Sequence, residues 1–299
     1  MMRFKHLFST VIVVLFAVVL AACSHHTLVE SKKDSTGYTP DPATEYLVTQ
    51  YADATGVQGT FYTITNDTTL IIIDGGWADN ASAVREVIAA HGNHVNAWVP
   101  SHPHQDHAGA FNQIYAAPDG ITIDAVYDNG FDYDFIEAAG EPYDDITVME
   151  TYHALTQDAS NVTHLHRGDV LSICGLTFSV LNAYDDTVLQ NVGDEKDYQN
   201  NASLLLKVSS VNSSMLFCSD IKYDMNDSLL AACKDQLACD YVQTGHHGNW
   251  SFSEEFYDAA GASVYFIDAP SSITDNADFP ASTLKSDLLA KGKTVLDFS

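Results

Sequence analysis

Basic residues are scarce in this chain of 299 residues, where 13 lysines and arginines stand against 40 aspartates and glutamates. With histidine neutral, the formal net charge is −27 at pH 7. A surface this acidic repels a phosphate backbone, so the composition disfavours non-specific binding to nucleic acid. The same charge favours solubility and tolerates cationic ligands.

Cysteine is also sparse. None of the five cysteines forms a Cys-x-x-Cys pair, which leaves no support for a thiolate zinc site or a thioredoxin-like redox motif. Cys174 and Cys218 stand in apolar, strand-like runs and are expected to be small core residues. Cys233 and Cys239 flank a short segment, and their spacing leaves open whether they pair after export to an oxidising compartment.

Long apolar runs are missing as well. The longest, Val11–Leu20, is short for a membrane span and follows the positively charged Arg3 and Lys5. Leu20-Ala21-Ala22-Cys23 resembles a bacterial lipobox, which predicts a signal peptide over residues 1–22 and a lipidated Cys23. An ordinary secretory signal that ends in cysteine is the alternative.

Residues 23–44 are rich in small and polar side chains and predict a flexible tether, while 45–299 suffices for one large α/β domain. No internal repeat is apparent. Cleavage before Cys23 would leave 11 basic and 40 acidic residues, a formal charge of −29. The predicted location is the bacterial cell membrane, with the lipid-anchored domain facing outward.

Hydrophobic periodicity predicts alternating strands and helices. Asn80 is the expected N-cap of a helix over 80–91, and a second helix is expected to begin near Ala108. Further helices are predicted over 144–157 and 282–290. The predicted strands are 60–65, 70–73, 97–100, 121–127, 163–166, 170–173, 176–182, 203–208, 215–219, 241–244, 264–267 and 294–298.

The segment 101–109 concentrates metal-binding side chains at the end of one of these strands. It reads Ser-His-Pro-His-Gln-Asp-His-Ala-Gly and places His102, His104, Asp106 and His107 within six residues. Imidazole nitrogens and carboxylate oxygens suit zinc and similar divalent ions. Ligands that leave a short loop on alternate sides can serve two such ions.

This segment resembles the His-x-His-x-Asp-His signature of the metallo-β-lactamase-fold hydrolases. The resemblance continues in the same order through 70–76 (Leu-Ile-Ile-Ile-Asp-Gly-Gly), 217–220 (Phe-Cys-Ser-Asp) and 244–248 (Thr-Gly-His-His-Gly). It is strongest to the branch that includes the extracytoplasmic hydrolase domain of DNA-uptake channel proteins and the phosphorylcholine esterases. The resemblance implies an α/β fold in which two sheets lie between outer helices, a four-layer αββα sandwich.

The resemblance also implies a set of metal ligands. His102 and His104 would hold a first metal, Asp106 and His107 a second, and Asp220 would bridge the two. One of His246 and His247 would complete the second site, which leaves the other to contact a phosphoryl oxygen or to protonate a leaving group. Two divalent ions are expected, zinc first and manganese as the alternative. Asp74 is expected to orient the histidine loop from behind.

One part departs from the family pattern. A third histidine for the first metal usually follows the strand matched here by 176–182, but the next residues, 183–186, contain no imidazole. Asp185 or Asp186 is the candidate replacement, and an oxygen ligand there would make manganese more plausible. The earlier histidines 153, 164 and 166 are the other candidates.

Metal-assisted hydrolysis is the predicted chemistry. Two cations that share a bridging water lower its pKa toward neutrality and polarise a carbonyl or phosphoryl oxygen, and Asp106 is expected to help hold the nucleophile. The expected substrate is a phosphodiester or related ester, either a small molecule or part of the cell envelope. The alternatives are a non-catalytic binding protein that kept the fold, and a β-lactamase-type amide hydrolase.

Aromatic residues near the motifs suggest a substrate group. The segment 128–135 interleaves aromatic rings with carboxylates, and Trp250 and Phe252 follow the second histidine motif. If these side chains line the mouth of the site, their ring faces and negative charge would attract a quaternary ammonium group. A choline-type head group is therefore one expected substrate feature, and simple packing of these rings is the other interpretation.

Overall fold

The computed structural model describes residues 44–53, 55–140, 144–192 and 197–299. The predicted signal peptide, the lipidated Cys23 and all but the last residue of the predicted tether lie outside these ranges. Among the described residues, no helix has the length and apolarity needed to cross a membrane.

The first sheet contains six strands in the order β1-β2-β3-β5-β7-β8. The strands are β1 (Leu47–Gln50), β2 (Phe61–Asn66), β3 (Thr69–Asp74), β5 (Ala97–Val99), β7 (Val126–Asp128) and β8 (Val162–His164). The strands predicted over 60–65 and 70–73 form a hairpin, since β2 pairs antiparallel with β3 from Phe61↔Asp74 to Asn66↔Thr69. β1 also pairs antiparallel with β2, whereas the pairs β3 with β5, β5 with β7 and β7 with β8 are parallel.

The second sheet contains seven strands in the order β15-β14-β13-β12-β11-β10-β9. The strands are β9 (Val170–Ile173), β10 (Leu176–Asn182), β11 (Leu205–Ser209), β12 (Ser214–Phe217), β13 (Tyr241–Gln243), β14 (Val264–Phe266) and β15 (Thr294–Leu296). The β9–β10 hairpin turns at Cys174 and Gly175, whose φ angles of 50° and 82° match a tight turn between twisted strands. From β12 to β15 the pairing is parallel.

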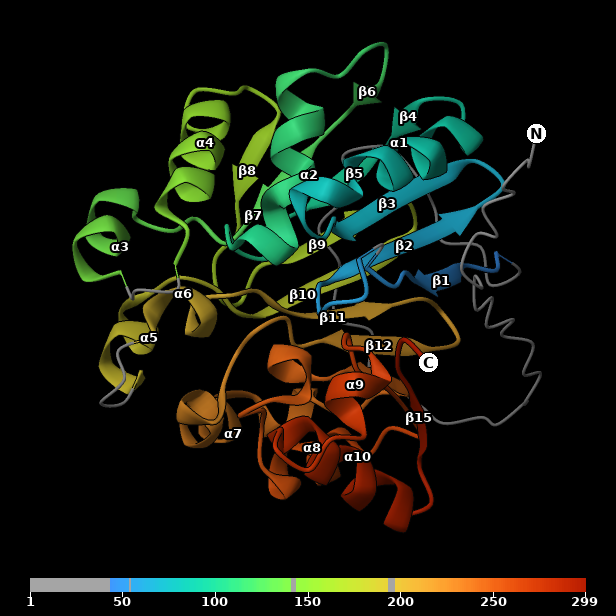
Figure 1. Cartoon of the computed structure of the whole chain (residues 1–299), viewed down its shortest axis with the longest axis vertical. Helices are drawn as coiled ribbons and strands as arrows, with labels where there is room; N and C mark the ends of the chain where they lie inside the picture. The colour runs from blue at the N-terminus through green and yellow to red at the C-terminus, as the bar shows by residue number, and fades with distance from the viewer. Residues whose placement is uncertain (1–43, 54, 141–143, 193–196) are drawn as a thin grey trace, which may run out of the picture.

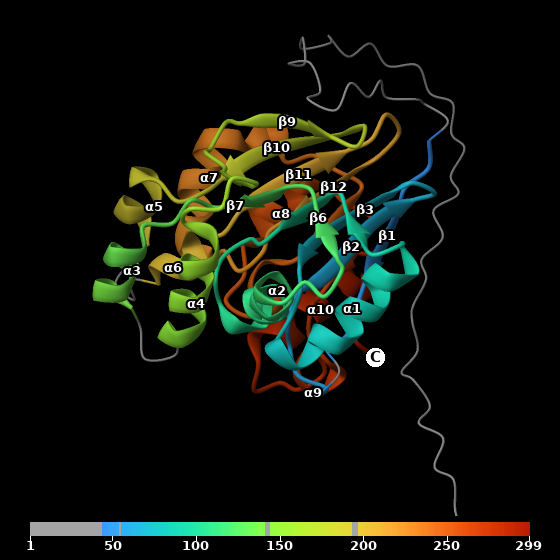
Figure 2. The same ribbon diagram turned by 90° about the horizontal axis from the view of Figure 1, so that it is seen from above.

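Helices cover the outer faces of both sheets (Figure 1). The larger ones are α1 (Ala81–Ala90), α2 (Gln105–Ala116), α4 (Ile146–Thr156), α7 (Asn226–Cys233), α8 (Glu254–Ala260) and α10 (Pro280–Ala290). Figure 2 shows α1, α2 and α4 gathered along one side of the strands. The shorter ones are α3 (Tyr133–Ala139), α5 (Asp186–Asn191), α6 (Tyr198–Asn201) and α9 (Ser271–Thr274), with 3-10 turns at Ala78–Asn80, Tyr223–Met225, Lys234–Gln236 and Gly245–Gly248.

The cores follow from strand periodicity. On β3, Ile71 and Ile73 point into the core between the sheets, where they meet residues such as Phe178 of β10. Leu70 and Ile72 point the other way and pack with α1, α2 and α4. A third core joins the second sheet to α7, α8 and α10. Because side chains alternate across a strand, an apolar run such as 70–73 is typical of a sheet covered on both faces. The predicted four-layer αββα sandwich is confirmed.

Three local expectations need correction. The helix expected near Ala108 begins at Gln105, so Asp106 and His107 lie in its first turn and not in a loop. Asn80 occupies the N-cap position of α1 but makes no side-chain cap bond, and its amide donates to Asp53 Oδ2 at 2.8 Å. The single strand predicted over 121–127 is two, β7 and the short β6 (Thr122–Ile123), which pairs with β4 (His94–Val95).

Candidate metal centre

Three segments that leave strand ends converge on one buried cluster. His102 and His104 follow β5, Asp106 and His107 begin α2, Asp220 follows β12, and His247 follows β13. β5 belongs to the first sheet and β12 and β13 to the second. Loops after parallel strands meet at one edge of a sheet, so the sandwich gathers six side chains that are up to 145 positions apart in the sequence.

His102, His104 and Asp220 form the first group of buried ligand atoms. His102 Nε2 and His104 Nδ1 lie 2.9 Å apart, and their rings meet edge to face with centroids 4.6 Å apart. Two imidazole nitrogens and a carboxylate oxygen suit zinc and also manganese.

Asp106, His107, Asp220 and His247 form the second group, and all four are buried. Asp220 Oδ1 lies 3.0 Å from His107 Nε2, and Asp220 Oδ2 lies 3.2 Å from His247 Nε2. His247 Nε2 is also 3.0 Å from Asp106 Oδ2. Asp220 thus belongs to both groups, which is the position expected of a bridging ligand.

Unsatisfied polar atoms test whether these residues fit a metal. His107 Nε2, Asp220 Oδ1 and His247 Nε2 are buried and, among the described residues, have no hydrogen-bond partner of acceptable geometry, although they lie within ion-pair distance of one another. Buried polar atoms without partners are costly and need an explanation. Ligand atoms aimed at a common point satisfy that requirement when a cation is bound, so the donor set fits divalent metal ions.

Asp74 supports the second group from behind. Its Oδ2 lies 2.8 Å from His107 Nδ1, and its Oδ1 accepts a 2.6 Å bond from the backbone N–H of Ser101. The carboxylate therefore fixes the His107 ring and directs Nε2 toward Asp220. Asp74 has a φ of 57°, and Gly76, two positions later, has 75°, so β3 ends in a tight turn that glycine favours.

Asp144 plays the same part for the first group, and sequence reasoning missed it. Asp144 Oδ1 lies 2.6 Å from His104 Nε2, and each side chain is 7% exposed. This contact leaves Nδ1 as the ring nitrogen that faces His102. Asp144 stands just before α4, forty positions from His104, and nothing in its sequence context distinguishes it from the other acids.

Charge within the cluster shifts several pKa values. Burial alone lowers the pKa of His107, but Asp220, Asp74 and Asp106 outweigh it and raise that pKa well above its usual range. For His247, burial is outweighed by Asp220 and Asp106, which raise the pKa to about 10. Burial lowers the pKa of His102. Burial alone raises the pKa of Asp220, but His107 and His247 outweigh it and lower that pKa well below its usual range, so this carboxylate is negative beside them.

The structure separates the two histidines of the second motif. His247 belongs to the second ligand group, whereas His246 lines the adjoining cavity and donates from Nδ1 to the Asn249 carbonyl at 2.9 Å. Both have left-handed backbones, with φ angles of 47° and 53°. A non-glycine pair in this region costs free energy and persists only where the surroundings impose it, as at functional sites.

The expected replacements for the third histidine lie elsewhere. Asp185 caps α5 by accepting from Val188 N–H and binds the Arg167 guanidinium at 2.7 and 3.2 Å, while Asp186 is exposed in the first turn of that helix. Neither belongs to a ligand group. The other candidates are also elsewhere: His153 stacks on Tyr133, His164 binds Asp128, and His166 is exposed. In this structure neither acid reaches a ligand group: Arg167 and the cap of α5 engage Asp185, and Asp186 is exposed.

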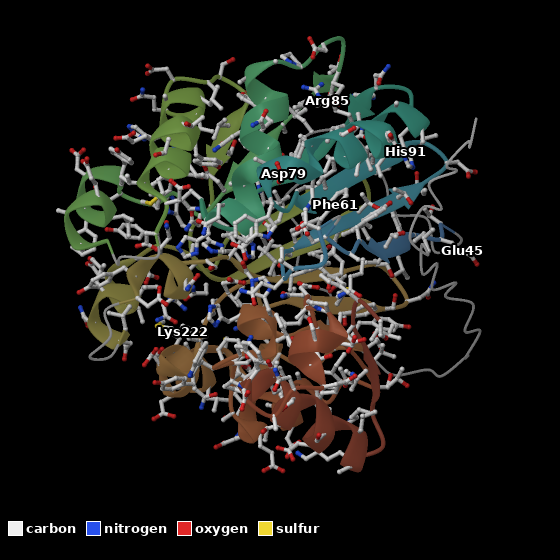
Figure 3. All side chains as sticks on the ribbon, in the orientation of Figure 1. Glu45, Phe61, Asp79, Arg85, His91 and Lys222 are labelled. Atoms are coloured by element: carbon white, nitrogen blue, oxygen red, sulfur yellow. The ribbon has the colours of Figure 1, made fainter. Side chains whose placement is uncertain are left out.

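A cavity of about 460 Å³ opens onto the ligand groups. Besides His104, Asp106, Asp220 and His246, its lining includes residues that sequence reasoning missed: Gln58, Trp77, Gln105, Asp197, Asn200 and Lys222. Lys222, labelled in Figure 3, precedes α7, and its Nζ lies 3.1 Å from Asp197 Oδ2. Their side chains are 7% and 2% exposed, so this ion pair is buried beside the ligands.

Only some of the aromatic residues predicted to line the site do so. Trp250 is 52% exposed and lines the cavity, with its ring 5.9 Å from that of His246. Phe252 is instead buried in the core beneath α8, where it stacks on Phe256. No residue of 128–135 lines the cavity, because Asp128 holds Tyr152 and Phe131 packs on the helix-side core. The second tryptophan of the lining is Trp77.

All four cysteines in the described ranges are free thiols. Cys218 and Cys233 are buried, the first as predicted for a core residue, and the Cys233 thiol donates to the Leu229 carbonyl at 3.2 Å. Burial raises the pKa of Cys233 to about 11 and that of Cys239 to about 12. A Cys233–Cys239 disulfide is not part of this structure.

Comparison with known proteins agrees with this architecture. Residues 54–123, which include the first histidine motif, match the family model described as the metallo-beta-lactamase superfamily. None of the curated proteins matches the chain. Together with the observed layers, the match identifies the fold as the metallo-β-lactamase fold.

Solved structures resemble the chain at low sequence identity. The E377D mutant of CmlA beta-hydroxylase is 14% identical, with a TM-score of 0.51 over 86% of this chain and 53% of its own. The metallo-beta-lactamase fold protein YhfI from Bacillus subtilis is 12% identical, with a TM-score of 0.49 over 84% and 95% of the two chains. A diphosphatase from the PhnP family is 13% identical, with a TM-score of 0.43 over 71% and 75%. At these identities the likeness concerns the fold alone.

Proposed function

We propose that this protein is a dinuclear metal-dependent hydrolase that cleaves a phosphodiester or a related ester. The observation that carries the proposal is the place of Asp220 in both ligand groups, with its two carboxylate oxygens directed at different histidines. A carboxylate in this position holds two cations close together. When bound, the two ions would activate a water molecule and polarise the substrate oxygen.

The residues of this chain supply binding and proton transfer around that centre. His102, His104 and Asp220 would hold the first ion, and Asp106, His107, His247 and Asp220 the second, with zinc as the proposed metal and manganese as the alternative. His246 keeps Nδ1 bonded to a carbonyl, so its Nε2 is the atom placed to hold or give up a proton beside the leaving group. Asp106 would position the nucleophile.

Lys222 favours an anionic substrate. It is a buried ammonium group in the cavity lining, and a phosphoryl oxygen is a natural partner for such a point charge. Its pairing with Asp197 fixes the side chain before substrate arrives. An amide hydrolase of the β-lactamase type would use the same ligands, and Lys222 would equally serve a carboxylate on its substrate, so Lys222 favours an anionic substrate of either kind.

A quaternary ammonium group on the substrate is a narrower proposal. The indole rings of Trp77 and Trp250 both line the cavity. The face of an indole ring attracts such a cation by roughly 1 kcal/mol per contact. Trp250→Ala should then slow hydrolysis of a choline-bearing phosphodiester more than that of an uncharged ester with the same leaving group. Equal losses for both esters would contradict this.

The proposed location is the outer side of a bacterial cell membrane, with the domain anchored through a lipid on Cys23. The lipobox-like segment and the acidic charge support this. In this setting the substrate is a small molecule or a phosphoester of the cell envelope, and the charge disfavours nucleic acid.

Metal content and activity together test the proposal. The full chain, purified without added metal, is analysed for zinc and manganese and assayed on a panel of phosphodiesters and a β-lactam. Asp220→Ala should lower occupancy at both sites, whereas Asp106→Ala should lower it at the second alone. Phosphodiester hydrolysis should be slower in Asp220→Ala than in wild type. Added metal should raise the rate of wild type purified without metal, but it should not restore the rate of Asp220→Ala.

The alternatives predict different results. A non-catalytic binding protein would retain metal yet hydrolyse nothing on the panel. A β-lactamase-type enzyme would cleave the β-lactam in preference to every phosphodiester. Unchanged metal content in Asp220→Ala would refute the bridging assignment itself.

A further inference from the structure

A second hollow adjoins the metal cavity. It has a volume of about 790 Å³ and lies between α8 and α10, and we call it the α8–α10 groove. Its lining comes from the loop after the second histidine motif, from α8, from the segment before α10 and from one face of α10. No part of the proposed hydrolytic reaction uses it.

The groove combines apolar side chains with charged ones. Phe279 and Trp250 are exposed by 36% and 52%, and Leu284 and Pro280 add further apolar area between them. Exposed large apolar residues are common singly, but a gathered set in a concave surface marks a binding site.

The charges at the rim favour one class of occupant. The one basic residue of the lining, Lys291, is already neutralised, since its Nζ lies 2.7 Å from Glu254 Oε1 and 2.5 Å from Asp258 Oδ1. Asp278 and Asp287 add exposed carboxylates to the lining. The groove therefore suits an apolar group that is uncharged or cationic, and it opposes an anionic one.

Trp250 connects the groove to the metal cavity, because the same side chain lines both. The connection is also mechanical. The side-chain Oδ1 of Asn249 accepts a 3.1 Å bond from the backbone N–H of Ala281, in the first turn of α10. The backbone carbonyl of Asn249 accepts from His246 Nδ1 at 2.9 Å. One wall of the groove is thus tied to the loop that carries His246.

We propose that the α8–α10 groove binds the apolar arm of the substrate whose ester group lies at the metal centre, and that this arm is an alkyl or similar chain without negative charge. The inference rests on the proposed function for its substrate, and it makes the enzyme selective for amphiphilic esters. Because each methylene buried from water improves binding by about fourfold, two or three methylenes in the groove would raise affinity by more than tenfold.

Direct binding tests the groove without relying on catalysis. Octyltrimethylammonium, 1-octanol and tetramethylammonium are titrated into the full chain by calorimetry. Thr283 lies in the groove lining on α10, and Ser286 lies outside it on the same helix, both exposed. Thr283→Trp should weaken binding of both octyl probes by at least tenfold, while the matched Ser286→Trp should not. Ala277→Trp fills the groove from another segment of its lining and is expected to act like Thr283→Trp.

Two results would refute the proposal that the groove binds an apolar chain. Tetramethylammonium that binds as well as octyltrimethylammonium would show that net charge alone attracts the probe. Circular dichroism shows which of Thr283→Trp and Ala277→Trp folds. If a folded variant binds the octyl probes as wild type does, the octyl group binds elsewhere on the protein.

Kinetics then separate the groove from the proposed function. Two p-nitrophenyl phosphodiesters are compared, one with a methyl and one with an octyl group. The ratio of kcat/KM for octyl over methyl should exceed ten in wild type and fall at least tenfold in Thr283→Trp. If both esters are hydrolysed and the ratio is near one, the groove does not bind the substrate's arm, while the proposed hydrolase activity is supported. Octyl binding to the groove without hydrolysis of either ester refutes the phosphodiesterase instead.

Discussion

Asp144 supports a histidine of the first ligand group, and this contact makes a sharp prediction. Asp144 bonds His104 Nε2 at 2.6 Å behind the first group, and Asp74 contacts His107 Nδ1 at 2.8 Å behind the second. Replacing Asp144 by alanine should weaken the first metal and leave the second largely unaffected. Asp74→Asn should weaken the second metal and also affect the first, because Asp74 Oδ2 accepts from Ser101 Oγ, which lies 3.1 Å from His102 Nδ1.

The magnitude follows from the contact. A carboxylate that supports a ligating histidine from behind typically contributes 10- to 100-fold to metal affinity, or about 1.4–2.8 kcal/mol. The Asp144–His104 bond is short and each side chain is 7% exposed, so solvent screens it little and the upper half of that range is expected. Asp144→Asn, whose amide oxygen still accepts a hydrogen bond, should cost less than Asp144→Ala.

Competition with a chromophoric chelator measures the two zinc affinities in one titration. In Asp144→Ala the zinc affinity of the first site should fall. That of the second site should stay within about threefold of wild type, since His104 is not among its ligands. Asp158→Ala, an exposed acid after α4, is the control and should change neither. An equal fall at both sites, or none, would refute the assignment of Asp144 to the first group.

Three further predictions concern the fold, the thiols and the anchor. Phe178→Ala, in the core between the sheets, should lower the free energy of unfolding by roughly 3–5 kcal/mol in urea titrations; a loss below about 1 kcal/mol would contradict its packing role. Cys233 and Cys239, with pKa values raised to about 11 and 12, should stay protonated at pH 8 and resist iodoacetamide until the protein unfolds, as mass spectrometry would show. Native protein should fractionate with membranes and need detergent for extraction, whereas Cys23→Ala should escape processing at that site; a native soluble form lacking residues 1–22 would argue against the lipid anchor.

The sequence by itself predicted the fold and most of the residues that form the candidate ligand groups. The apolar run at 70–73 and the hairpin at 170–182 are local patterns, and their strands were predicted with small errors at the ends. The helices α3, α5, α7 and α8 were missed, because elements of six to eight residues are too short to show a clear helical period. The ligands stood out because several imidazoles and carboxylates in a few positions rarely occur without a function.

Only the tertiary structure decided which residues complete the site. Asp144, Trp77 and Lys222 carry no local signal. Loops between distant strands bring Trp77 and Lys222 to the cavity and place Asp144 against His104. The choice between His246 and His247 depended on a left-handed turn after β13, and the exclusion of Asp185 depended on Arg167. A sequence pattern reports the chemistry available along the chain. Which groups come within 3 Å of one another is set by sheet register and packing, and these are properties of the folded chain as a whole.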